Sequence, residues 1–450
     1  MYQSALPIDD TAKDEPEDIV IVSRQEEVRV KKPVRNQAEM VIRDLDSMID
    51  DTHTVRAIWE FIGKLDLSAF YRTIKVTSNQ PGRPASDPRV LLALWVYATV
   101  EGIGSARRLA RLTEEHDAYR WLRGGVPVDY HLLAEFRVHH QSEIDDLITQ
   151  IIALLLKARL IEIKRVSQDG IRVRANAGNS SFHRKWSLRK CLKEAREQVK
   201  RVAAEREHPD GGSSRREQAA RERVVREREE RVKEALRQLP EVQAAKERQK
   251  KHAGKAKAAK VKEARVSITD PSARTMKMAD GGFRPAYNVQ FATENRSQVI
   301  VGVDVTNQGA DQGQALGMEE KVEKRTGKQP EDYLIDGGFV DLGDIKTLEG
   351  KGIKVYAPPK DSKGKEISNR KGTSGSPEIT DWRLRMKTEE ARTIYKERSG
   401  TSECVNALMR TRYGLQQFTV RGVSKVLGVT LLMVLAHNIV RWISLTKSIA

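Results

Sequence analysis

Apolar residues recur at helical spacing through the first third of the chain. The clearest run follows a period of about 3.6 residues and consists of Val90, Leu91, Leu94, Trp95 and Ala98. Gly102 and Gly104 come after this run, and Ser105 stands in the N-cap position before a second helix over 106–112. A further apolar face lies on 144–156. These patterns predict an all-α domain over residues 55–160.

The period of the apolar residues changes at Ile161. Residues 161–173 predict a strand that reaches Asp169, a turn at Gly170 and a second short extended piece. The later elements are expected as strands over 283–292 and 298–305, a helix over 309–322, a short buried strand over 333–335, and, after another helix, a last strand over 353–356. This order predicts a mixed α/β sheet domain over 161–182 and 266–450.

Residues 183–265 have a different composition, dominated by Arg, Lys, Glu, Gln and Ala. Glu222 and Arg226 are four residues apart, as are Glu227 and Arg231, which supports exposed helices. We therefore expect a charged helical hairpin inserted into the sheet domain, turning near 208–214. Its pattern is compatible with a solvated arm, with an arm that contacts DNA, and with a dimerising coiled coil.

The charge balance makes nucleic acid the leading partner. Lys and Arg total 80 against 63 Asp and Glu, a net charge of +17 that attracts a polyanion. The two cysteines, Cys191 and Cys404, form no metal-ligand or disulfide framework. Residues 1–54 have the composition of a flexible tail, with one short strand at 19–22 and no secretory signal.

One apolar run, over 426–443, needs separate treatment. His437, Asn438 and Arg441 interrupt it, so it falls short of the roughly 18 clean apolar residues of a membrane span. We expect His437 and Asn438 to be helix-packing groups and the whole protein to work in the cytoplasm, associated with the nucleoid and without a membrane partner. Asp304, in an alternating strand pattern, is expected at an edge or facing solvent.

Three acidic residues occupy positions from which they could bind metal. Asp169 and Asp336 each follow apolar strand residues and precede glycine, which places a carboxylate at the rim of a sheet. Asp residues at such positions also commonly cap turns. Glu403 and Arg410 are seven residues apart, so on a helix they project from one face. That segment is also compatible with an ordinary surface helix stabilised by salt bridges.

Several motifs, taken in order, resemble those of DDE transposases of bacterial insertion sequences. They are 167–184 around Asp169, 269–274, 282–290, 335–339 around Asp336, and the set Tyr395, Arg398, Glu403 and Arg410. Residues 87–137 resemble the N-terminal helical domain of the same enzymes, and the resemblance covers most of 55–445. Two departures occur: four residues rather than three separate Arg398 from Glu403, and Arg410 stands where lysine is usual.

The resemblance implies a ribonuclease-H-like catalytic domain joined to a helical DNA-binding domain. Asp169 would lie on its first strand, Asp336 after its fourth and Glu403 on a following helix, together forming the catalytic and metal-binding set. Mg²⁺ is the expected ion and Mn²⁺ a possible substitute. Tyr395, Arg398 and Arg410 are expected to contact DNA. Further candidate DNA contacts, suggested by their positions alone, are Arg172, Arg174, Arg184, Arg107 and Arg108.

The implied activity is metal-dependent cleavage of double-stranded DNA at the ends of a mobile element, followed by strand transfer into target DNA. Two Mg²⁺ ions about 3.5–4 Å apart can activate a water or a 3′-hydroxyl and stabilise the leaving oxygen. Terminal inverted repeats and target DNA are the expected partners, with a homodimer as the active complex. Two other functions remain compatible with the sequence: a domesticated DNA-binding protein without activity, and a metal-dependent nuclease that cannot join DNA.

Overall fold

The computed structural model describes residues 35–36, 38, 40, 42–75, 84–207, 214–252, 263–359, 364 and 375–447. The chain divides into two compact units, Met1–Asp44 and Leu45–Ala450, and the second contains nearly all the described residues. Most of the predicted N-terminal tail, including the strand at 19–22, lies outside the described residues, and so does most of the predicted hairpin turn, at 208–213.

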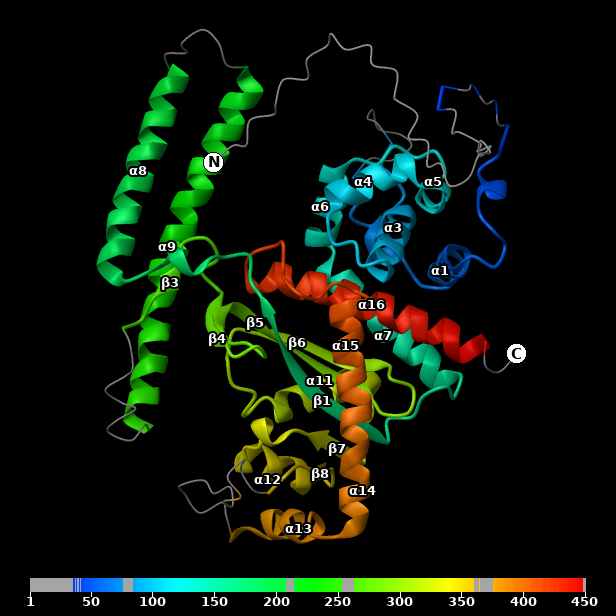
Figure 1. Cartoon of the computed structure of the whole chain (residues 1–450), viewed down its shortest axis with the longest axis vertical. Helices are drawn as coiled ribbons and strands as arrows, with labels where there is room; N and C mark the ends of the chain where they lie inside the picture. The colour runs from blue at the N-terminus through cyan, green and yellow to red at the C-terminus, as the bar shows by residue number, and fades with distance from the viewer. Residues whose placement is uncertain are drawn as a thin grey trace, which may run out of the picture. The chain divides into compact units, whose positions relative to one another are not determined.

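The first part of the second unit is helical, as the apolar period predicts (Figure 1). After the 3-10 turn η1 (Asp46–Met48), its helices are α1 (Thr54–Ile62), α2 (Ser68–Tyr71), α3 (Pro88–Val100), α4 (Ala106–Glu115), α5 (Asp117–Arg123), α6 (Tyr130–His139) and α7 (Gln141–Lys157). Asp87 caps α3 by accepting from Arg89 N at 2.8 Å. Ser105 caps α4 as predicted, by accepting from Arg108 N at 3.4 Å.

The second part contains a mixed sheet of six strands. Its strands are β1 (Arg165–Arg174), β4 (Arg274–Lys277), β5 (Phe283–Glu294), β6 (Ile300–Thr306), β7 (Asp332–Ile335) and β8 (Lys354–Tyr356). The central strand β1 pairs antiparallel with β5 and parallel with β7. Strand β8 continues the parallel side, and β6 and β4 both pair antiparallel with β5. A helical region followed by a mixed sheet confirms the predicted fold class.

Helices cover the sheet and complete the C-terminal part of the chain. They are α11 (Ala315–Thr326), the short 3-10 helix η3 (Gly337–Phe339), α12 (Leu342–Gly350), α13 (Pro377–Arg385), α14 (Glu389–Arg398), the π-helical turn η5 (Ser399–Glu403), α15 (Cys404–Thr411) and α16 (Val423–Lys447). Helix α11 starts later than the predicted residue 309, because the preceding segment is tied to the sheet through Asp311.

Two predictions about β1 are wrong. The strand begins at Arg165 rather than near Ile161, and it runs through Gly170 without a turn. Gly170 lies opposite Gln290 on β5, and a Cβ placed there would lie 2.3 Å from Gln290 Nε2. The glycine therefore permits a close approach of side chains from the neighbouring strand, rather than a reversal of the backbone.

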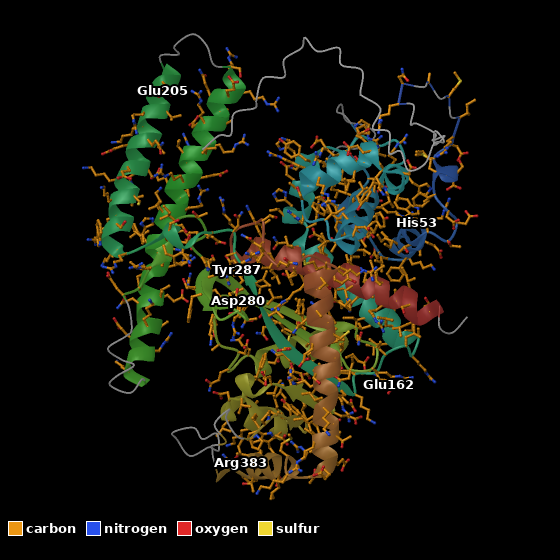
Figure 2. The ribbon with its side chains drawn as sticks, viewed as in Figure 1. His53, Glu162, Glu205, Asp280, Tyr287 and Arg383 are labelled. Carbon is orange, nitrogen blue, oxygen red and sulfur yellow. The ribbon has the colours of Figure 1, made fainter. Side chains whose placement is uncertain are left out.

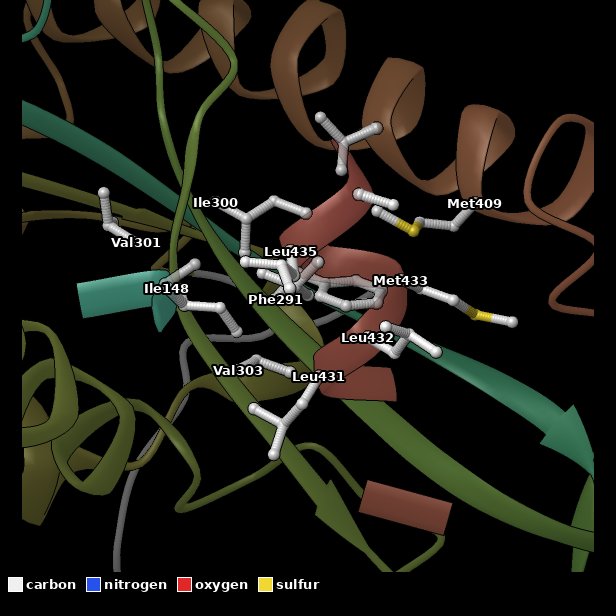
Figure 3. Close-up of a cluster of buried hydrophobic side chains, with 14 of the residues drawn as sticks. Ile148, Phe291, Ile300, Val301, Val303, Met409, Leu431, Leu432, Met433 and Leu435 are labelled. Carbon is white, nitrogen blue, oxygen red and sulfur yellow. The ribbon is translucent and has the colours of Figure 1, made fainter. Parts of the chain in front are cut away.

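Helix α16 joins the helical region to the sheet through one continuous hydrophobic core. It packs against α3, α7 and β6, and Figure 3 shows its leucines beside Ile148 of α7 and Phe291 of β5. His437 Nε2 bonds with the Gln298 carbonyl at 2.8 Å, and Asn438 accepts from Ile300 N and donates to Ile300 O. The prediction that these two residues are packing groups is confirmed.

By length and composition, α16 is long and apolar enough to cross a membrane, contrary to the expectation drawn from its polar interruptions. Within the protein, however, 67% of its most apolar stretch is buried. A core helix of a folded protein meets the same criterion, because burial against protein and burial in lipid both select apolar residues.

The charged segment forms the predicted helical hairpin, with α8 (Lys185–Glu207) lying along α9 (Arg215–His252) (Figure 1). The hairpin rests on a two-stranded sheet of β2 (Phe182–His183) and β3 (Val266–Ser267). A small separate core holds its base together, made of Leu188, Ala235, Leu239, Val242, Ala264 and Val266. Arg274 also donates to Gln238 Oε1 at 2.9 Å, which ties α9 to β4.

Candidate active site

Two of the predicted acidic residues lie on neighbouring strands, at the point where the shorter strand ends. Gln168 of β1 pairs with Ile335 of β7 in parallel register, and Asp169 and Asp336 are the next residue on each strand. Asp336 is exposed and accepts from Gly337 N at 2.6 Å, which caps the short helix η3. The parallel pairing therefore brings carboxylates 167 positions apart in sequence together at the point where β7 ends, although β1 continues past Asp169 to Arg174.

Asp169 is the more enclosed of the two carboxylates. Its Oδ1 accepts from Gly170 N at 2.8 Å, and its Oδ2 accepts from Asn406 Nδ2 at 3.0 Å. Arg398 Nη1 lies 3.8 Å from the same Oδ2. Burial raises the pKa of Asp169 above its ordinary value, and the negative charges of Asp336 and Asp311 act in the same direction. The Gly170 hydrogen bond and the Arg398 charge oppose that rise.

The helix that faces this pair contains one π-helical turn. Helices α14 and α15 are joined by η5 (Ser399–Glu403). This turn accommodates the four residues that separate Arg398 from Glu403, one more than the three in the motif of the DDE transposases that the chain resembles. A π turn bonds residues five apart, so it accommodates one extra residue without ending the helix. Arg398 and Glu403 are five residues apart, and the turn keeps them on similar sides of the helix.

Tyr395 and Arg398 lie beside the aspartates. The Arg398 guanidinium carbon is 5.7 Å from the centre of the Tyr395 ring. Burial raises the pKa of Tyr395, Arg398 opposes the rise, and the charges of Asp336 and Asp169 add to it. These electrostatic contacts bring Tyr395, Arg398, Asp169 and Asp336 into one neighbourhood.

Glu403 lies on the same helix, but no contact joins it to either aspartate. Its side chain is exposed and makes no hydrogen bond or ion pair with any described residue. Asn406, three residues further on, is the residue that contacts Asp169. Within the described part of the chain, no three His, Cys, Asp or Glu side chains converge closely enough to hold one ion.

A further acidic residue, Asp311, belongs to this neighbourhood and was missed by the sequence analysis. Its Oδ1 accepts from Asn288 Nδ2 at 2.6 Å and Gln290 Nε2 at 2.8 Å, and its Oδ2 accepts from Arg172 Nη2 at 3.1 Å. Asn288 and Gln290 are buried on one face of β5. Two amides that alternate with apolar residues in the centre of this strand were the signal available in the sequence, because buried polar groups need partners.

Four arginines line a depression in the protein surface. Arg172 and Arg174 come from the end of β1, Arg284 from β5 and Arg410 from α15. Asp280, labelled in Figure 2, is also on its wall, and it pairs with Arg284 at 2.6 Å. The Arg410 guanidinium has no ion pair with a described residue, whereas Arg172 is held by Asp311. The predicted contacts Arg172, Arg174 and Arg410 are thus brought together.

The remaining predicted DNA contacts lie elsewhere on the chain. Arg184 precedes α8 and pairs with Glu263 at 3.2 Å. Arg107 and Arg108 are exposed on α4, where the Arg107 guanidinium carbon lies 5.0 Å from the centre of the Tyr130 ring. No described contact joins these three arginines to Asp169 or Asp336.

Two family models match the chain. One, described as a transposase domain, matches residues 43–139, which include α1 to α6. The other, described as a transposase DDE domain, matches residues 359–443 and so includes Tyr395, Arg398, Glu403 and Arg410. No curated protein and no solved structure matches the chain.

Proposed function

Because two transposase family models match the chain and support a DDE transposase of an insertion sequence, we propose that it cuts double-stranded DNA at the ends of its element and joins the freed 3′-hydroxyls to target DNA. Its two DNA partners would then be the terminal inverted repeats and the target DNA, and it would bind both in the cytoplasm. Two copies of the chain would hold the two ends of the element together.

The adjacent positions of Asp169 and Asp336 on parallel strands carry this proposal. The two residues meet where β7 ends, and the negative charge of Asp336 contributes to the raised pKa of Asp169. A group of acidic oxygens that repel one another is a suitable environment for a hard divalent cation, which prefers oxygen ligands. The donor set thus fits the divalent metal that this family generally uses.

We propose that Asp169, Asp336 and Glu403 hold Mg²⁺, with Mn²⁺ as a substitute. When bound, the metal would supply activation of the attacking oxygen and stabilisation of the leaving oxygen in an in-line displacement at phosphorus. The argument for Glu403 is its helical face: Asn406 lies three residues later and contacts Asp169, so the same face of α15 looks toward the sheet. The Glu403 side chain is exposed and has freedom to turn toward the aspartates.

The basic residues around the carboxylates would position the DNA. Arg398 lowers the cost of ionising Asp169 and can also hold a phosphate through its remaining N–H groups. Tyr395 supports the Arg398 guanidinium with its ring. Arg174 and Arg410 would contact the backbone within the depression. In the helical region, the exposed Arg107 and Arg108 would bind the DNA at the end of the element.

A plasmid carrying the element's ends provides the test. We expect Mg²⁺-dependent strand cleavage by the full-length protein, reduced to background by Asp169→Asn, Asp336→Asn or Glu403→Gln, while DNA binding persists. Asp304→Asn is the matched control, since Asp304 pairs with Lys321 at 2.6 Å on β6, away from the proposed ligands. Full cleavage by one of the three variants would remove that residue from the ligand set.

A strand-transfer assay separates transposition from the other two functions. A labelled duplex with a pre-cut 3′-hydroxyl end should be joined to an unlabelled plasmid in the presence of Mg²⁺. Cleavage without joining would establish a nuclease, and binding without either reaction would establish an inactive DNA-binding protein.

A further inference from the structure

The base of the helical hairpin presents an exposed cluster of basic residues around a tryptophan. Trp186 is 67% exposed, the largest exposure of any described tryptophan. Four cations surround it on the first turns of α8: Lys185, Arg189, Lys190 and Lys193. All five side chains are exposed, and no acidic residue occurs on α8 before Glu194. We call these five residues the α8 basic patch.

The cations of this patch lack the acidic partners that several other cations of the hairpin have. Further along, arginines are matched with glutamates: Arg196 with Glu229, Arg226 with Glu222 and Arg237 with Glu234. Lys185, Arg189, Lys190 and Lys193 form no ion pair with any described residue. The first turns of α8 therefore present four positive charges that no described acidic residue compensates.

The first turns of α8, which present the patch, are fixed by contacts with neighbouring elements. Leu188 is fully buried against α9 and β3, and the side chain of Trp186, two residues earlier on the helix, faces away from it. His183 Nδ1 bonds with Ser187 Oγ at 2.9 Å, which fixes the first turn of α8 to β2. A partner that docks here would meet a surface whose backbone is already ordered, so little ordering entropy would oppose binding.

The chain connects this patch to the arginine-lined depression of the candidate site. Arg284 lines that depression, and the adjacent Phe283 is 63% exposed. The Phe283 carbonyl accepts from Asn179 Nδ2 at 3.5 Å, and Asn179 leads through β2 directly into α8. Basic and aromatic groups thus continue from the depression to the base of the hairpin. Figure 2 shows Asp280 near this junction and Glu205 far from it, toward the other end of α8.

We propose that the α8 basic patch binds the phosphate backbone of duplex DNA beside the segment held at the carboxylates, with Trp186 packing on a deoxyribose or base edge. This inference rests on the proposed function, because it extends the DNA path beyond the active site. The uncompensated charge favours a polyanion over an apolar protein partner. Of the three interpretations of the charged hairpin, a DNA-contacting arm is the one that these contacts favour.

The salt dependence of the binding of the full chain to a non-specific 40-base-pair duplex tests whether the cations of the patch contact DNA phosphates. The patch variant replaces Lys185, Arg189 and Lys190 with alanine. The control variant replaces Arg196, Arg226 and Arg237, three paired arginines of the same hairpin, so both variants lose equal charge. We expect the patch variant to lower the slope of log affinity against log salt by about two to three units, and the control by less than one. Equal losses in both variants would overturn the proposal.

Acrylamide quenching tests the tryptophan. Duplex DNA should protect the accessible fluorescence of the wild-type protein, and Trp186→Phe should remove that protected component. Binding without protection would overturn the proposal, and so would protection that appears with rising protein concentration in the absence of DNA, since that would reveal a contact between chains. Both measurements are independent of cleavage, so they remain decisive if the protein proves to be inactive.

Discussion

Asn406 Nδ2 donates a hydrogen bond to Asp169 Oδ2 across 3.0 Å, joining residues 237 positions apart in the chain. The bond ties α15 to the central strand at the proposed metal site. It also fixes which face of that helix looks toward the sheet, and Glu403 and Arg410 share that face at three residues before and four residues after Asn406.

Asn406→Ala should therefore reduce cleavage more than it reduces stability. A hydrogen bond to a charged group contributes about 1.5–3 kcal/mol, which corresponds to a loss of roughly 10- to 100-fold in rate if the bond orients Asp169 during the reaction. The melting temperature should change little, because the Asn406 side chain is only half-buried. Thr411→Ala, which removes a hydroxyl bonded only within the same helix, is the control. Wild-type cleavage by Asn406→Ala would show that the bond has no functional role.

Asp169→Asn should abolish cleavage and yet stabilise the metal-free protein at pH 7. Burial raises the pKa of Asp169 in the folded state, so the folded protein binds its proton more tightly than the unfolded chain does. Stability from this group is therefore present at low pH and is lost as pH rises through the folded-state pKa. The neutral asparagine avoids this loss.

Thermal melting with a chelator, from pH 4 to pH 8, measures the effect. The advantage of Asp169→Asn over wild type should be greatest at the upper end of this range and should shrink as the pH falls and Asp169 takes up its proton. Asp304→Asn, at a partly exposed aspartate paired with Lys321, is the control variant. A lower melting temperature for Asp169→Asn than for wild type at pH 7 would contradict the prediction.

Gly170→Ala should destabilise the protein by about 1–3 kcal/mol. The added Cβ would lie 2.3 Å from Gln290 Nε2 and 2.7 Å from Asp311 Oδ1, so the buried amides around Asp311 would have to move. Gly317→Ala on α11 is the control, because a Cβ there meets nothing within 4 Å. Urea unfolding of the two variants should separate them clearly, and equal midpoints would show that the strands tolerate the extra methyl group.

Arg410→Ala should weaken binding by a similar factor on specific and non-specific DNA. The Arg410 guanidinium lines the arginine-rich depression without an ion-pair partner among the described residues, so a phosphate is its natural ligand. The salt slope should fall by about one unit, and Arg410→Lys should recover most of the affinity. The melting temperature without DNA should stay within the error of the wild-type value. A large fall would instead show that Arg410 stabilises the fold.

Patterns local to the sequence determined the elements themselves. The apolar period around Trp95 predicts α3, and the cap residue Ser105 predicts the start of α4, because both depend on residues within one or two helical turns. The short apolar run before Asp336 likewise predicts β7 and the carboxylate at its end. The motifs around Asp169, Asp336 and Glu403 carry the resemblance to DDE transposases, because each motif is a short run of neighbouring residues.

Tertiary structure decided which of these residues meet. The hydrogen bond from Asn406 to Asp169 and the ion pair between Arg172 and Asp311 join segments far apart in sequence, and no local period specifies such pairs. Gly170 shows the same limit: its neighbour Asp169 suggested a turn, whereas the side chains of β5 require a strand without a Cβ at that point. Local sequence sets backbone conformation through sterics and periodic burial, but the partners of a buried polar group are set by the register in which distant strands and helices pack.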